Sequence, residues 1–168
     1  MTREFDGRPV PRGVLERMVY AATRAPSAGN VLVRVLIVIA DPQHVRLLRA
    51  VTPSFLANAT AAIVICTNLE RAEQQMGRQG RDVLSLVDAG AVGENILLAA
   101  ESLGMGACFV RSSVDAAIRE LLDLPSTFRV DVIVGLGLPI QRKAQRIRAQ
   151  AAPEPIIYEG RYGVPWRA

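Results

Sequence analysis

The stretch DVLSLVDAGAVGENILLAAESLG, residues 82–104, decides how the fold of this chain is interpreted, because it predicts the longest regular element. It is apolar nearly all round, and Gly104 stands where a helix would end, so the pattern predicts one long buried helix. Its middle holds four small residues: Ala89, Gly90, Ala91 and Gly93. Simple core packing explains these residues, and a central helix of a dimer interface explains them at least as well.

Four apolar runs predict the strands that this helix packs against. Residues 31–40 (VLVRVLIVIA) and 59–68 (ATAAIVICTN) are rich in β-branched residues and nearly all apolar, which is typical of strands buried on both faces. Residues 106–110 and 128–139 predict two more strands. With the helices, they indicate an α+β fold with a central mixed β-sheet flanked by helices, in a single domain over residues 1–168.

Shorter helices are predicted between these runs. In PRGVLERMVYAATRA, residues 11–25, five apolar residues fall on one helical stripe: Val14, Leu15, Met18, Val19 and Ala22. Asp41 is suited to cap a helix that continues to Val51, and Ser113 is a plausible N-cap for the next. The polar segment 69–81 contains two glycines and predicts a loop or a frayed helix.

Composition points to a partner that covers apolar surface. Half of the 168 residues are hydrophobic, and the mean hydropathy is +0.22. Extra apolar surface of this kind is usually buried in a large dimer interface. The tail APEPIIYEGRYGVPW, residues 152–166, has three prolines and is stable only when it docks on something, for which the partner subunit is a candidate.

The charge pattern argues against a nucleic-acid partner. The net charge is +4, but most arginines are scattered among acidic residues. The exception is QRKAQRIR, residues 141–148, which carries four positive charges and no acid. This run is either a solvated loop or an anion site, and nucleic-acid binding through it is the weakest hypothesis.

The chain has few side chains that carry out chemistry themselves. Cys66, Cys108 and His44 show no metal-ligand spacing, and we expect buried free thiols in a reducing cytoplasm. The N-terminus is polar and proline-rich, so we expect no signal peptide, and Asp88 and Glu94 interrupt the long apolar run, so we expect no membrane span. There is no phosphate loop, dinucleotide fingerprint or nucleophile elbow. An enzyme with this inventory would rely on a cofactor.

Three segments resemble the nitroreductase family of FMN-dependent oxidoreductases. They are REFDGRPVPRGVLERMVYAATRAPSAGNVLVRVLIVI (3–39), DAGAVGENILLAAESLGMGACFV (88–110) and LLDLPSTFRVDVIVGLGLP (121–139). The resemblance covers nearly the whole chain in order. It implies a sandwich fold, an intertwined homodimer with FMN sites at the interface built by both subunits, and hydride transfer from NAD(P)H through FMN to a small nitroaromatic or quinone. The alternative is a non-catalytic protein of this fold that binds flavin or another small ligand.

The resemblance also implies which residues bind the cofactor. They are Arg3, Pro26, Ser27, Ala28, Asn30, Gly104, Gly106, Arg146 and Arg148. The loop around Ser27 and Asn30 matches a loop that meets the isoalloxazine edge, where a hydroxyl and an amide can hydrogen-bond the flavin carbonyls and N3. Arg3 matches a basic residue near flavin N1 and O2, which stabilises the reduced anion.

The later implied positions lie at the reactive face and at the phosphate. Gly104 and Gly106 match the segment that packs near the reactive face of the flavin. Arg146 or Arg148 matches the residue that holds the phosphate, for which the arginine fork is well suited. No catalytic side chain is assigned.

Three departures from the family pattern concern cofactor binding. Met1 stands where the family has a phosphate-binding serine, and the arginine that precedes it is missing. Arg34 stands where the family has a tryptophan, and the segment 69–81 is short. Loss of one charge-assisted hydrogen bond to the phosphate would weaken FMN binding by about tenfold to a hundredfold.

Overall fold

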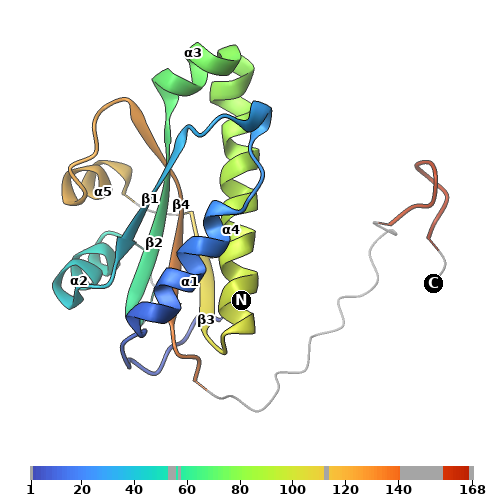
Figure 1. Ribbon diagram of the computed structural model, residues 1–168. Coiled ribbons are helices and arrows are strands. Elements are labelled where there is room, and N and C mark those ends of the chain that lie inside the picture. Colours follow the sequence, from blue (N-terminus) through green and yellow to red (C-terminus); the bar gives the residue numbers. More distant parts are fainter. Residues whose placement is uncertain (1, 53–55, 57, 112–113, 141–156, 167–168) are drawn as a thin grey trace.

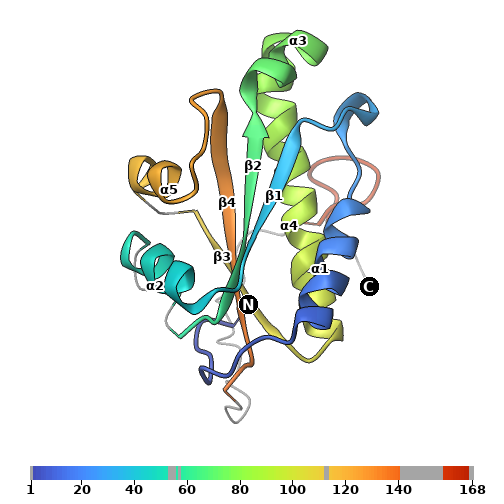
Figure 2. The same ribbon diagram turned by 60° about the vertical axis from the view of Figure 1, so that its left-hand side comes forward.

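A four-stranded sheet between two layers of helices forms the centre of the protein. The computed structural model describes residues 2–52, 56, 58–111, 114–140 and 157–166. The strand order is β1-β2-β4-β3, with bounds Arg34–Ile39 for β1, Ala61–Asn68 for β2, Gly106–Val110 for β3 and Phe128–Gly137 for β4. Figures 1 and 2 show α1 (Arg12–Thr23) and α4 (Ser85–Ser102) on one face, and α2 (Pro42–Ala50) and α5 (Asp115–Leu121) on the other. The predicted α+β sandwich is confirmed.

The sheet differs from the prediction in two respects. All three strand pairings are antiparallel, so the described strands form an antiparallel sheet, not a mixed one. The expectation that residues 31–40 form a strand buried on both faces is also wrong. β1 begins at Arg34 and lies at the sheet edge, where Val35 and Val38 are exposed. β2 is central and buried as predicted, because strands flank it on both sides and helices cover both faces.

The short helices follow from local sequence signals. Pro11 precedes α1 in the N-cap position, and Leu15, Met18 and Ala22 of the predicted stripe are buried. The Asp41 side chain accepts hydrogen bonds from the backbone N–H groups of Gln43 and His44, which confirms the predicted cap of α2. In α5 the N-cap position is held by Val114, and Ser113 lies outside the described residues.

The segment predicted as a loop or a frayed helix is a helix. α3 (Leu69–Gln79) is capped by the Asn68 side chain and is interrupted at Gly77, which has φ 67°. A π-helical turn, Gly80–Leu84, then leads into α4. The polar composition was misleading, because glutamate, arginine, glutamine and methionine are good formers of exposed helix.

The long apolar helix α4 packs against both α1 and the sheet. The Asn95 side-chain amide donates to Ala21 O at 3.0 Å, and a Cβ at Gly93 would lie 2.2 Å from Cζ of Phe109 on β3. By length and composition alone, the stretch Leu69–Ser102 could span a membrane. Core helices of globular proteins meet the same criteria, and the buried face of α4 is a core face here.

Both cysteines are buried and free, as predicted. Burial raises the pKa of the Cys66 thiol from 9.0 to about 12; the Asp131 carboxylate adds to the increase, and Arg119 opposes it. The folded protein therefore retains a proton that the unfolded chain releases above about pH 9. The corresponding stability is intact below that pH and is lost as the pH rises towards the folded pKa.

We predict that this thiol makes folding stability fall in mild alkali. Between pH 8 and pH 10, the free energy of unfolding should fall by about 1 kcal/mol more in the wild type than in Cys66→Ala. Urea unfolding at the two pH values measures this difference, and Cys108, present in both proteins, cancels. Equal losses in the two proteins would show that folding does not raise the pKa of the Cys66 thiol.

Candidate functional site

The loop that links α1 to β1 contains a tight left-handed turn. After α1 ends, Ala28–Asn30 form a short 3-10 turn, in which Gly29 has φ 58° and Asn30 has φ 56°. Glycine and asparagine are the residues that tolerate such angles best. The backbone N–H of Asn30 donates to Ser27 O at 3.0 Å. Ser27 is half-buried and Asn30 is exposed, so the turn leaves both predicted ligand-binding side chains near the surface.

A buried ion pair holds the backbone of this loop through hydrogen bonds. The Asp88 carboxylate accepts the Ala28 backbone N–H on both oxygens, at 3.0 and 3.1 Å. The Arg34 guanidinium donates to Ala25 O at 2.9 Å and to Pro26 O at 3.4 Å. Arg34 Nη1 lies 3.8 Å from Asp88 Oδ2, and the side chains are only 7% and 8% exposed.

Neither Asp88 nor Arg34 was among the predicted site residues. In the sequence, Asp88 interrupts an apolar run and opens the second family-like segment, and Arg34 is a departure from the family pattern; neither feature predicts a contact with the loop. A lone acid on the buried face of an apolar helix was the available signal, since a buried carboxylate requires partners. The partner in this case is a backbone amide 60 residues away, which a sequence pattern does not reveal.

A second group of predicted residues gathers where β3 begins. The Thr2 backbone N–H donates to Ala107 O at 2.9 Å, and this places the segment that carries Arg3 beside β3. A Cβ at Gly106 would lie 2.8 Å from Thr2 Cγ2, so this glycine is required by the close approach of the N-terminal segment. Gly104 ends α4 with φ 68°, as predicted.

A groove of about 420 Å³ adjoins this second group between α4 and β3. Its lining residues are Thr2, Glu94, Leu97, Leu98, Glu101, Met105, Ala107 and Phe109. Thr2, Met105 and Ala107 are the chain neighbours of Arg3, Gly104 and Gly106. The groove is therefore the cavity most closely associated with the predicted cofactor residues at this end of the molecule.

The two groups lie at opposite ends of α4. Asp88, under the loop, and Ser102, before Gly104, are separated by about 21 Å along the helix axis. Figure 1 shows the loop beside the first half of α4 and the N-terminus near its far end. One chain does not bring all the predicted residues together. Arg146 and Arg148 lie outside the described residues.

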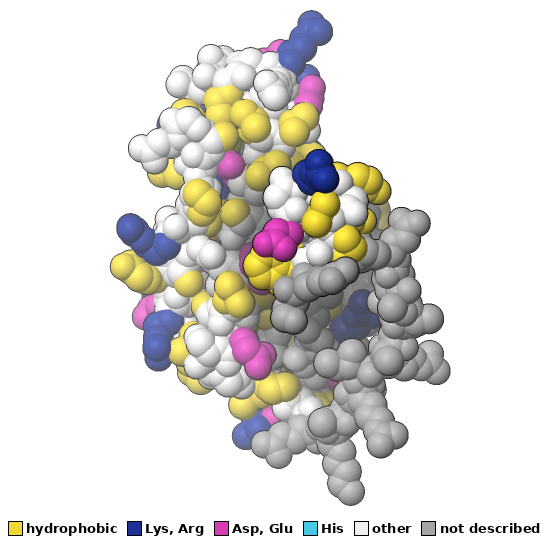
Figure 3. Space-filling model, turned by 90° about the vertical axis from the view of Figure 1, so that its right-hand side faces the viewer, with side chains coloured by type: hydrophobic (Ala, Val, Ile, Leu, Met, Phe, Trp, Pro, Cys, Tyr) yellow, Lys and Arg dark blue, Asp and Glu magenta, His cyan; other side chains and the backbone are white. Residues whose placement is uncertain are grey.

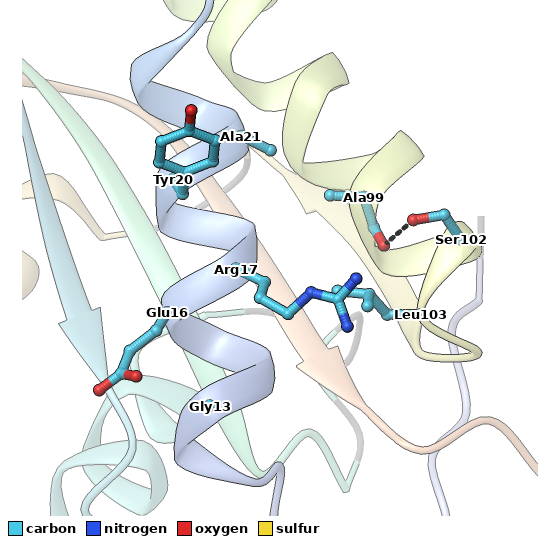
Figure 4. Close-up of a pocket in the computed structure, with 8 residues that line it drawn as sticks. All are labelled: Gly13, Glu16, Arg17, Tyr20, Ala21, Ala99, Ser102 and Leu103. Carbon is cyan, nitrogen blue, oxygen red and sulfur yellow. Dashed lines mark hydrogen bonds between the residues drawn. The ribbon is translucent and has the colours of Figure 1, made fainter.

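A larger groove, of about 550 Å³, runs between α1 and the C-terminal half of α4. In Figure 4 Arg17 extends from α1 towards Leu103, while Glu16 points away from α4. None of the predicted site residues lines this groove, so we do not place the functional site there.

Side chains suited to metal binding do not gather in the described part of the chain, where no group of three or more His, Cys, Asp or Glu could hold a metal ion. His44 lies exposed on α2, with Nδ1 2.9 Å from Asp41 Oδ1. Hydrogen bonds from the His44 backbone N–H and ring lower the pKa of Asp41. This histidine therefore supports the helix cap and belongs to neither group of site residues.

Comparison with known proteins places the chain in a family. The model of the Nitroreductase family matches residues 1–54 and 42–138. A protein of Archaeoglobus fulgidus, named provisionally as an NADH dehydrogenase/NAD(P)H nitroreductase, is 34% identical over 150 residues, which is 84% of this chain and 81% of the relative. The oxygen-insensitive NADPH nitroreductase of Salmonella typhimurium is 29% identical, with coverage of 95% and 70%.

A solved structure agrees with these sequence matches. The FMN-dependent nitroreductase of Clostridium difficile R20291 is similar with a TM-score of 0.69 and 26% identity, over 84% of each chain. The chain belongs to the Nitroreductase family, as the three segments of its sequence indicate.

We predict that the left-handed turn makes Gly29 sensitive to substitution. Gly29→Ala should lower the free energy of unfolding by about 1 kcal/mol, because a Cβ at φ 58° is strained. The matched control is Gly13→Ala, since Gly13 lies in α1 with open space around its Cα. That change should leave stability unchanged or raise it slightly. Urea unfolding measures the free energy of unfolding of both variants. Equal values would show that the turn adjusts to a Cβ at position 29 without strain.

Proposed function

We propose that this protein is an FMN-dependent oxidoreductase that passes hydride from NAD(P)H to a small electron-poor acceptor of the nitroaromatic or quinone type. Family membership supports the reaction class, together with relatives named as NAD(P)H nitroreductases and as an FMN reductase (NADPH). The observation that carries the proposal is the turn Ala28–Asn30, held on a buried carboxylate. Its Ser27 and Asn30 side chains lie at or near the surface.

The chemistry of this loop fits the edge of a flavin ring. The flavin edge alternates carbonyl acceptors with an N–H donor, and the Asn30 amide can both donate and accept while the Ser27 hydroxyl can do either. Gly29 has no side chain to hinder close approach. FMN held by these residues would supply the redox chemistry, which is hydride transfer between NAD(P)H and the acceptor.

Residues at the other end of α4 complete the proposed site. Arg3 supplies positive charge for the reduced flavin, which favours the anion and so raises the potential. Gly104 and Gly106 have no side chains, so a ligand in the groove between α4 and β3 can approach the backbone closely there. Arg146 or Arg148 binds the phosphate, where the arginine fork matches two oxygens.

We propose that a homodimer brings the two groups together, so that each site takes its loop from one subunit and its Arg3 group from the other. The separation of about 21 Å along α4 supports this. In a dimer with antiparallel α4 helices, the start of α4 in one subunit would lie beside the end of α4 in the other. The outward side of the π-turn and α4 also carries apolar residues: Val83, Leu86, Val87 and Leu98, which are 44–63% exposed. Figure 3 shows hydrophobic side chains at the surface on this side of the molecule.

Gly90 adds to the argument for the dimer. Gly93 is explained within one chain, by Phe109, but a Cβ at Gly90 would meet nothing within 4 Å. A surface glycine in a helix costs stability, about 0.5–1 kcal/mol relative to alanine, and it allows another helix to approach closely. We place the working protein in the cytoplasm, where its two free thiols would stay reduced.

The visible spectrum of the purified protein tests the function. We expect a flavin absorption band, present on purification or acquired on adding FMN, that bleaches when NADPH or NADH is added without oxygen. Bound flavin that neither nucleotide reduces would favour a non-catalytic flavin-binding protein. A folded protein that takes up no flavin would overturn the proposal.

The dimer makes a separate prediction. Val87→Arg should convert the dimer to a monomer, because it places a charge in the apolar surface of α4. Val114→Arg is the matched control, since Val114 is similarly exposed, at 58% against 63%, but precedes α5. Light scattering after size exclusion measures the mass. A monomeric wild type, or a dimer that survives Val87→Arg, would remove this face of α4 as the interface.

A further inference from the structure

We infer that Arg34 and Asp88 are positioning residues, which hold the loop of residues 25–30 in the shape that meets the flavin. The inference rests on the proposed function and adds a role for two residues that touch the backbone of the loop.

The two side chains grip the loop from two different elements. Asp88 projects from α4 and accepts the Ala28 N–H on both carboxylate oxygens. Arg34 begins β1 and donates to two consecutive carbonyls, those of Ala25 and Pro26. The loop backbone is therefore fixed immediately before and immediately after Ser27.

Burial makes this arrangement costly unless the hydrogen bonds form. Both side chains are less than 10% exposed, and their charges lie 3.8 Å apart. Removing two charges from water is costly, and their attraction and good hydrogen bonds must offset that cost. Here these bonds go to the loop backbone. A shift of the loop would leave two buried charges without their hydrogen bonds, and this penalty keeps the loop in one position.

A second buried charge cluster shows a different use of the same chemistry. Asp131 accepts from the Thr67 hydroxyl and from Arg129 Nε, each at 2.5 Å. Arg129 also donates to Ser85 Oγ at 2.9 Å. Those bonds join β2, β4 and the start of α4, which are regular elements. The Arg34–Asp88 pair instead bonds to a loop with a left-handed turn, at the position of the proposed flavin contact.

Preorganisation is the expected effect on ligand binding. A loop already held in its binding shape loses less conformational freedom when the ligand arrives, so affinity rises without a new contact. The fixed backbone holds the Ser27 and Asn30 side chains in position for the ligand. Arg34 should therefore affect FMN affinity by positioning Asn30.

A double-mutant cycle on FMN affinity tests that route. We expect Arg34→Met to weaken FMN binding at least tenfold. Asn30→Gly, which removes the amide and tolerates φ 56°, should weaken binding clearly in the wild type and much less in the Arg34→Met background. Purely additive effects would show that Arg34 does not act through Asn30 and would overturn the inference.

Arg119→Met is the matched control. Arg119 lies on α5, which Figure 1 shows on the other face of the sheet, and it also donates to two backbone carbonyls, Pro125 O and Phe128 O, just before and at the start of β4. Its replacement should reduce stability and leave FMN affinity within twofold of the wild type. An equal loss of affinity in Arg119→Met and Arg34→Met would mean that general destabilisation, and not positioning, is responsible.

Amide hydrogen exchange gives a readout that needs no flavin. In the flavin-free protein, Arg34→Met should speed exchange of the Ala28 amide at least tenfold, while the amide of Ile96 inside α4 changes little. Arg34→Lys keeps the charge but not the forked guanidinium, so its Ala28 exchange rate should lie between those of the wild type and Arg34→Met. If Arg34→Met does not fold, Arg34→Lys replaces it in this experiment. Unchanged exchange at Ala28 would overturn the inference. A wild type that binds no FMN would instead overturn the proposed function, and the exchange result would still decide whether the pair holds the loop.

Discussion

The close approach of α4 to the sheet is the constraint on which the rest of the structure depends. At Gly93 the ring of Phe109 occupies the space that a Cβ would fill, so the helix can lie directly on the strands. From that contact α4 extends in both directions. Its beginning holds the loop of residues 25–30 through Asp88, and its end delivers the chain to β3 through Gly104. Both groups of proposed site residues are therefore placed by one helix.

Much of the fold could be predicted, because burial imposes periodicity on the sequence. The stripe of α1, the cap of α2 and the buried strand β2 all carry local signals that the structure confirms. β1 was predicted wrongly, because an apolar run does not reveal whether a strand has a neighbour on both sides. The mixed sheet was also wrong for the described strands, since the relative direction of strands is set by long-range pairing.

The candidate site was predictable in its loop but not in its support. The residues Pro26 to Asn30 are recognisable by their order and by their turn chemistry. Asp88 and Arg34 are not, because what defines them is a set of hydrogen bonds to backbone atoms, which nearly every residue type carries. The backbone partner of Asp88 lies 60 positions away, so only the folded chain brings the two together.

The division of the site residues between the two ends of α4 has a genetic consequence. In the proposed homodimer, every single substitution is present in both subunits, so a defect at either end damages both sites. Two differently damaged chains behave otherwise when they are mixed. A subunit with a defective loop, paired with a subunit with a defective N-terminal group, forms one site that contains both defects and one site that contains neither. Two inactive alleles in one cell would then complement each other and restore up to half of the sites in each mixed dimer.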